Sequence, residues 1–137
     1  MSDYVSDSLR RKVVDRANQQ CEYCKLPDKA SFFTFHIDHV VSLKHGGGTT
    51  LDNLAYACPL CNVAKGPDVA TFLDDIRIAV RFYNPRIDLW DDHFSVDTTG
   101  LMNDKTDIGR ATIKILGLNH PDAIIERIEM IRLGLLQ

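Results

Sequence analysis

Two Cys-x-x-Cys pairs constrain this chain more than any other feature of its sequence. Cys21 with Cys24, and Cys58 with Cys61, account for all four cysteines of the 137 residues. Two pairs with this spacing can present four thiolates to one tetrahedral ion, and Zn²⁺ is the usual occupant. The alternatives are two disulfides or free thiols. We expect zinc, because the segment between the pairs is too short to fold without a staple.

The N-terminal residues MSDYVSDSLRRK contain no apolar signal segment, which predicts a cytoplasmic protein. A reducing compartment favours metal binding over disulfides at paired cysteines. The sequence has no run of about 18 apolar residues and therefore predicts no membrane span. With 45% hydrophobic and 26% charged residues, the composition is that of an ordinary globular protein.

The net charge argues against a polyanionic partner, but its distribution weakens that argument. The chain carries a net charge of −3. Residues 1–66 hold eight Lys and Arg against seven Asp and Glu, a net of +1, and residues 67–137 hold eight against twelve, a net of −4. The stretch from Arg10 to Arg16 is either a solvated helix face or a basic contact for nucleic acid. Bound metal ions and such a patch would have to supply the attraction for DNA.

Apolar spacing and turn residues predict an α+β fold for the N-terminal half. A Gly46-Gly47-Gly48 loop separates two strand-like segments, and Gly66-Pro67 ends the last helix. We place a boundary there, between a core of residues 1–66 and a C-terminal α-rich extension of residues 67–137 that packs on it. The expected elements of the core are a helix at residues 9–20, strands at 32–41 and 51–57, and a helix at 59–65.

In the extension, apolar residues between Val69 and Tyr83 recur at helical spacing and predict a helix. Residues 94–96 predict a short strand, and residues 112–115 predict either a strand or a helical turn. Pro121 begins a final amphipathic helix.

The segment between the cysteine pairs places an acid beside a histidine, Asp38-His39, and the second pair leads into Asn62 and Lys65. A zinc clip that brings these groups together indicates catalysis as well as stability. Six short motifs, taken in order, resemble those of the HNH, or ββα-metal, nuclease family. They are CEYC, HIDHVV, GGG, DNL, CPLC and NVAKG. The resemblance covers residues 21–66 and implies a zinc-clipped ββα-metal core with an N-terminal helix and a C-terminal helical extension.

The resemblance also implies roles for individual residues. His39 matches the general base, which takes a proton from water during phosphodiester hydrolysis. Asp38 matches a ligand of a catalytic Mg²⁺ or Mn²⁺, and Asn62 replaces a histidine ligand with an amide oxygen. Asn53 matches an asparagine that ties down the loop and orients the base. Lys65 matches a contact to the phosphate backbone.

Some of these assignments have structural alternatives. Asn53 could be a turn residue, and Asn62 could cap the short helix. His36 could bind phosphate or be an ordinary strand histidine. Adjacent strand residues point to opposite faces, so Asp38 and His39 can serve one site only if the strand ends or distorts there.

The sequence thus predicts a divalent-metal-dependent HNH endonuclease that acts on DNA. The alternative is a zinc-stapled module that binds nucleic acid or protein without hydrolysis, which the acidic net charge favours. A homodimer, or a protein partner that supplies specificity, is a further option, because so short a chain has little room for sequence readout.

Overall fold

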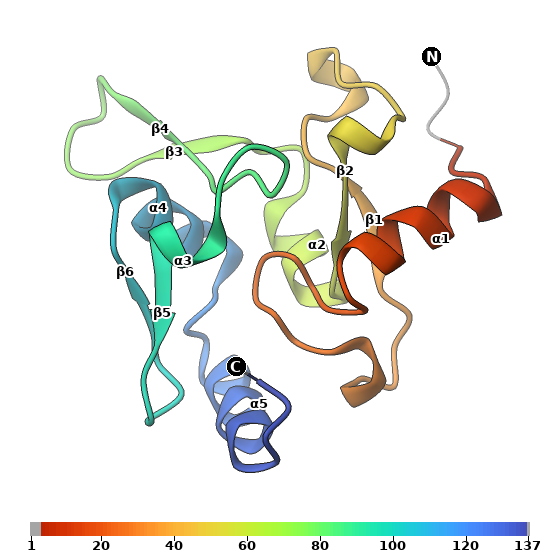
Figure 1. Ribbon diagram of the computed structural model, residues 1–137. Helices are drawn as coiled ribbons and strands as arrows, with labels where there is room; N and C mark the ends of the chain where they lie inside the picture. The colour runs from red at the N-terminus through yellow and green to blue at the C-terminus, as the bar shows by residue number, and fades with distance from the viewer. Residues whose placement is uncertain (1–3, 137) are drawn as a thin grey trace.

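The computed structural model describes residues 4–136 and contains short strands in three separate hairpins, with helices around them (Figure 1). The elements up to residue 66 are α1 (Asp7–Arg16), β1 (His36–His39), β2 (Leu54–Ala57) and α2 (Pro59–Lys65). Those that follow are β3 (Ala70–Phe72), β4 (Ala79–Arg81), α3 (Trp90–His93), β5 (Phe94–Val96), β6 (Met102–Asp104), α4 (Asp107–Leu116) and α5 (Pro121–Arg132). The mixed content of helix and short strand confirms the expected α+β class.

Helix α1 is shorter than expected and lies against the first hairpin. The hydroxyl of Ser6 caps it by accepting a hydrogen bond from the amide of Leu9. The helix ends before residue 20 because Asn18 and Gln19 adopt positive φ angles of 54° and 57°. At its last turn, the guanidinium of Arg16 donates to the carbonyl oxygens that flank the start of β2. Arg10, at the start of the same basic stretch, donates to the carbonyl of Phe35 at 3.0 Å, so two residues of that stretch have structural roles.

Strands β1 and β2 form a regular antiparallel hairpin, in which Asp38 faces Ala55 and His39 faces Leu54. Both strands are shorter than expected. Residues 32–34, which are exposed, and the buried Phe35 remain outside the ladder, and a 3₁₀ turn, Leu51–Asn53, precedes β2. Strand β1 ends directly after His39. The distortion expected at Asp38-His39 is not found, because the pairing stays regular through both residues.

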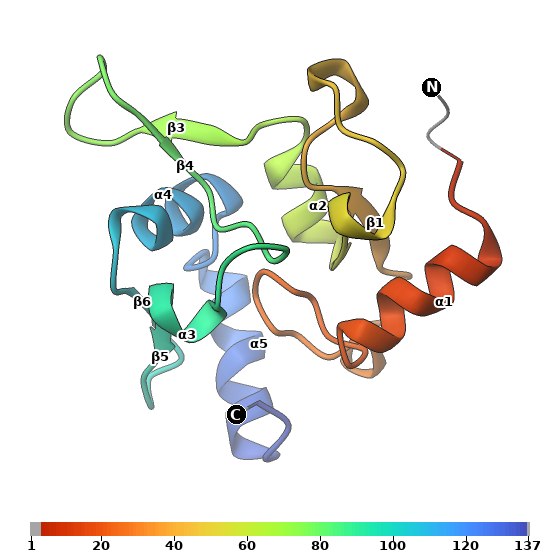
Figure 2. The same ribbon diagram turned by 45° about the horizontal axis from the view of Figure 1, so that its top comes forward.

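Helix α2 follows β2 through Cys58, whose sulfur caps the helix, and Pro59 occupies its first turn. It ends at Gly66, where φ is +52°. This confirms the helix expected at residues 59–65. Helix α2 packs against β1 on one side and against α4 on the other, and both views show it at the centre of the molecule (Figures 1 and 2).

The helix expected between residues 69 and 83 is wrong. Strands β3 and β4 form a hairpin there, with Thr71 opposite Val80, and the hairpin projects from the body in both views (Figures 1 and 2). The turn forms because the carboxylate of Asp75 accepts hydrogen bonds from the backbone amide and the guanidinium of Arg77. Ile76, in the turn between the two strands, is 81% exposed, so the apolar spacing does not correspond to one buried helix face.

The rest of the extension follows the sequence more closely. The strand at residues 94–96 is confirmed as β5, which pairs with β6, and residues 112–115 lie in α4, the helical alternative. The final helix is confirmed as α5, with Pro121 at its start. No helix within residues 4–136 is both long enough and apolar enough to cross a membrane.

The C-terminal extension, residues 67–137, contacts the edge of β2 that does not pair with β1. Glu22 exchanges main-chain and side-chain hydrogen bonds with Tyr56, and its carboxylate also pairs with Arg86 from the extension. Arg86 donates in addition to the carbonyl of Leu54 at 2.9 Å. Buried apolar side chains from both sides of residue 66 form one hydrophobic cluster. The division at that residue stays a prediction.

Candidate functional site

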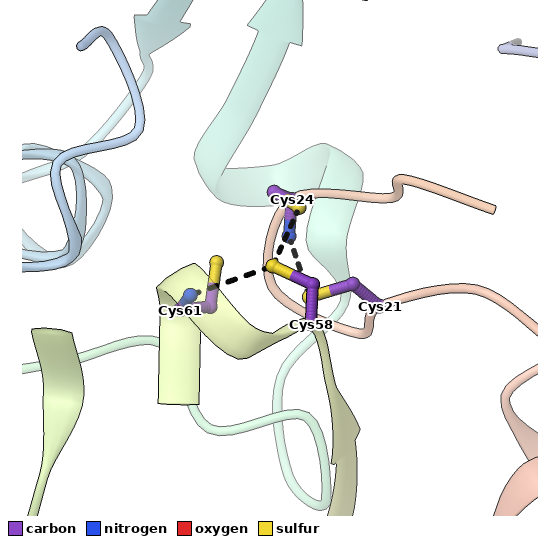
Figure 3. A group of neighbouring side chains, drawn as sticks. All are labelled: Cys21, Cys24, Cys58 and Cys61. Atoms are coloured by element: carbon purple, nitrogen blue, oxygen red, sulfur yellow. Dashed lines mark hydrogen bonds between the residues drawn. The ribbon is translucent and has the colours of Figure 1, made fainter. Parts of the chain in front are cut away.

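The four cysteines converge on one point between the first loop and the start of α2 (Figure 3). Their sulfur atoms all lie within 4.8 Å of one another, and those of Cys24 and Cys58 are 3.7 Å apart. A tetrahedral shell with Zn–S bonds of about 2.3 Å has edges of about 3.8 Å. All four thiols are free of disulfides. The cluster therefore has the donor type, number and spacing of a structural zinc site.

Backbone amides and neighbouring thiols already stabilise charge in this cluster. The amide of Cys24 points at the sulfur of Cys21 at 3.5 Å, and the amide of Cys61 points at the sulfur of Cys58 at 3.4 Å. Burial opposes ionisation of Cys21, yet hydrogen bonds from the other three cysteines outweigh it and lower the pKa of this thiol. Hydrogen bonding to Cys21 and Cys58 raises the pKa of Cys24. A divalent cation is the group that would let all four sulfurs ionise together.

His39 is half-buried at the end of β1, with its ring directed toward the glycine-rich loop. Its Nε2 atom lies 2.9 Å from the hydroxyl oxygen of Thr49. When Nε2 carries the ring proton and donates to Thr49, Nδ1 is the free acceptor. Thr49 is not among the predicted site residues, because a threonine after three glycines has no distinctive sequence signal.

Asn53 fastens the loop that follows β1. Its amide nitrogen donates to the carbonyls of Val41 at 2.8 Å and Gly48 at 2.9 Å, and its amide oxygen accepts from the amide of Val41 at 3.0 Å. Gly47 makes this arrangement possible. A Cβ atom on Gly47 would lie 1.8 Å from the oxygen of Val41 and 2.6 Å from the Asn53 nitrogen. The contacts are those of a residue that ties the loop down, and its role in orienting the base stays a prediction.

Asp38 points to the opposite side of β1, into the interior. Its carboxylate accepts a hydrogen bond from the hydroxyl of Tyr23 at 2.7 Å and forms an ion pair with Lys65 at 3.3 Å. Burial raises the pKa of Asp38, and the nearby Lys65 ammonium and Tyr23 hydroxyl oppose that rise. Burial, followed by the charge of Asp38, raises the pKa of Tyr23 well above its usual value.

Lys65 is the candidate whose surroundings fit its expected role least. The contact to the phosphate backbone stays a prediction, but the Lys65 side chain is 2% exposed and its ammonium lies among protein acceptors. The carboxylate of Asp38 is likewise unsuited to the catalytic ion expected there. The Lys65 ammonium lies 3.3 Å from one of its oxygens and 3.5 Å from the other. Mg²⁺ keeps several waters, so the ion and its waters would have to displace this ammonium from the buried carboxylate. This arrangement does not fit a divalent ion at Asp38.

The two remaining candidates are Asn62 on α2 and His36 at the start of β1. Asn62 is half-buried on α2, one turn before Lys65, and among the described residues its side chain has no hydrogen-bond partner, so its oxygen is available. His36 is exposed at the other end of β1, about 10 Å along the strand from His39. Two groups therefore meet at the end of β1: the Asp38–Lys65 pair on its inner side, and the His39 ring with Thr49 on the other. Asn53 holds the loop that follows, and His36 does not join either group.

Comparison with known proteins also relates the segment around the cysteine cluster to HNH endonucleases. The family model described as HNH endonuclease matches residues 21–68. Over 62 residues, 44% of this chain, the sequence is 39% identical to the CRISPR-associated endonuclease Cas9 of Corynebacterium diphtheriae, of which that segment spans 6%. No solved structure matches. The segment that carries the cysteine cluster and the β1–β2–α2 unit is thus an HNH endonuclease family domain with a four-cysteine site.

Proposed function

We propose that this protein is an HNH endonuclease that hydrolyses phosphodiester bonds in DNA, with His39 as the general base. The observation that carries the proposal is the placement of His39. It stands at the end of β1 inside the matched segment, and its Nε2 atom lies 2.9 Å from the Thr49 hydroxyl. Within residues 4–136 its Nδ1 atom has no hydrogen-bond partner, so Nδ1 can take a proton when Nε2 carries the ring proton. The likeness to a segment of Cas9, an endonuclease by name, supports the same reaction class.

In this mechanism, His39 Nδ1 removes a proton from a water molecule as its oxygen attacks phosphorus in line with the leaving oxygen. A positioned base of this kind contributes about 10²- to 10⁴-fold to the rate. Thr49 fixes the ring orientation, and Asn53 holds the loop that presents Thr49. The four-cysteine site, which we propose binds Zn²⁺, holds α2 and the first loop in place and takes no part in the reaction.

The catalytic Mg²⁺ or Mn²⁺ that the family implies would neutralise charge on the phosphate and the leaving oxygen. Of its two expected ligands, Asn62 offers an available oxygen, whereas Asp38 is paired with Lys65. We therefore assign no step to that ion and leave its ligands to experiment.

A supercoiled-plasmid assay tests the proposal. Wild-type protein is incubated with plasmid in EDTA, Mg²⁺ or Mn²⁺, beside His39→Ala and His120→Asn. His120 is an exposed histidine that caps α5, and asparagine preserves the cap. We expect the wild type and His120→Asn to relax the plasmid with a divalent ion, and His39→Ala to leave it intact. Full activity of His39→Ala would remove this residue from the mechanism.

A second candidate is a zinc-stapled binding module without hydrolytic activity. The pairing of Asp38 with Lys65 favours it, because a catalytic ion then lacks its expected carboxylate. Equal DNA binding with and without Mg²⁺, together with no cleavage under any condition, would support this reading. Cleavage that begins only when a second protein is added would indicate a specificity-providing partner, and paired cuts in both strands would indicate a homodimer.

A further inference from the structure

Lys65 is the most deeply buried charged side chain of the β1–β2–α2 unit, and nothing in the proposed reaction uses it. Its ammonium group has three N–H bonds and lies near three acceptor groups. These are the carboxylate of Asp38, the carbonyl oxygen of His39 at 3.3 Å and that of Val40 at 3.0 Å. A buried lysine is tolerated only when its charge is paired and its hydrogen bonds are made, and both conditions are met here.

The two carbonyl groups belong to the base itself and to the residue that follows it. On their other side, the amide of Val40 donates to the carbonyl of Asn53 at 2.9 Å, and the amide of Val41 donates to the Asn53 side chain. The backbone that leaves His39 is therefore held from two directions, by Lys65 of α2 and by Asn53 before β2. Removal of the ammonium would release one of the two constraints.

Asp38 connects this anchor to the cysteine cluster. Its carboxylate pairs with Lys65 and also accepts the hydroxyl of Tyr23, which lies between Cys21 and Cys24 in the first cysteine pair. Lys65 itself lies one helical turn after Cys61. The acid and the lysine thus join the first cysteine pair, the end of β1 and the helix that begins at the second pair.

We propose that Lys65, with Asp38 as its counter-ion, is a positioning residue that fixes the backbone at His39 and so aims the imidazole. The inference rests on the proposed function, since it names what orients the base of that reaction. It assigns Asp38 and Lys65 an internal role, in place of a metal ligand and a phosphate contact. Lys65 is too buried to reach a polyanion, and its ammonium occupies the side of Asp38 that a cation would need.

The test compares three variants at equal zinc content. Lys65→Met keeps the side-chain length but leaves the Asp38 charge unpaired, so the double variant Lys65→Met/Asp38→Asn is made beside it to remove both charges. Lys114→Met is the matched control, because Lys114 also donates to a main-chain carbonyl but is exposed on α4. The kinetic readouts are kcat and KM on a labelled duplex, the salt dependence of KM, and the Mg²⁺ concentration that gives half-maximal rate.

We expect the double variant to lose about 10- to 100-fold in kcat, because a small displacement of a reacting group has an effect of that size. KM, its salt dependence and the Mg²⁺ requirement should stay within about twofold of those of Lys114→Met. A raised KM with a weaker salt dependence would show that Lys65 contacts phosphate. A changed Mg²⁺ requirement would show that Asp38 is a metal ligand. Either result overturns the proposal, as does an unchanged kcat.

A readout that does not depend on cleavage separates this inference from the proposed function. Amide signals of residues 39–41 in ¹H–¹⁵N spectra should move in the double variant, while those of β5 and β6 stay in place. The wild type should also show a slowly exchanging ammonium signal from Lys65. Unmoved signals at residues 39–41 would refute the positioning role even if the protein cuts DNA. Moved signals in a protein that never cuts would refute the proposed function alone.

Discussion

Substitution of Gly47 by alanine adds only one methyl group, but it should strongly destabilise the loop that Asn53 holds. The added Cβ would lie 1.8 Å from the carbonyl oxygen of Val41 and 2.6 Å from the amide nitrogen of Asn53. The Val41 oxygen is a backbone atom and the Asn53 nitrogen is held by two hydrogen bonds, so the loop must move away. That movement breaks the two or three hydrogen bonds of the Asn53 side chain, which are worth about 1 kcal/mol each. We expect a loss of about 2–3 kcal/mol in the free energy of unfolding.

The neighbouring Gly48→Ala is the matched control. A Cβ there would meet nothing closer than 3.7 Å, so the free energy of unfolding should change by less than about 0.5 kcal/mol. The two variants are compared by urea and thermal unfolding at saturating zinc, where Gly47→Ala should melt roughly 5–10 °C lower. If the loop opens without global unfolding, the cleavage rate should fall instead. A Gly47→Ala protein as stable and as active as Gly48→Ala would refute the reasoning.

Three further outcomes follow from the structure. Mass spectrometry should find one Zn²⁺ per chain, and removing it with a strong chelator should unfold the protein, as loss of helix by circular dichroism would show. Arg86→Ala should cost about 3 kcal/mol in urea unfolding, because Glu22 loses its buried partner, whereas Arg77→Ala, which breaks an exposed pair, should change little. Burial and the neighbouring Asp28 raise the pKa of Tyr56 to about 12, above the usual 10. The stability contributed by the protonated Tyr56 hydroxyl is therefore complete below pH 10 and is lost as the pH rises toward 12. In an absorbance titration at 295 nm, the transition present in the wild type and absent from Tyr56→Phe should centre near pH 12.

The parts of the structure that the sequence predicted are those that short-range patterns determine. The spacing of the cysteines is enough to pair Cys21 and Cys24 with Cys58 and Cys61, since each pair forms a tight local turn. Helix α2 could be placed because Pro59 favours a helix start and Gly66 favours a helix end.

The parts that could not be predicted depend on contacts between distant segments. The apolar residues from Val69 to Tyr83 also fit a hairpin, and packing against α4 decides between the two: Lys114 of α4 donates to the carbonyl of Phe72, and Thr112 accepts from the amide of Tyr83. Lys65 carries the signal of an exposed helix residue, and only its position beneath β1 shows that it is buried against Asp38.

The central claim is that His39 accepts the proton of the attacking water, and imidazole rescue tests it most directly. The single-turnover cleavage rate of a labelled DNA duplex is measured for wild type and for His39→Gly, with and without added imidazole, at equal zinc content. We predict a fall of at least about 100-fold in His39→Gly and a partial recovery that grows with imidazole concentration. A His39→Gly protein that cuts at the wild-type rate without imidazole would contradict the account.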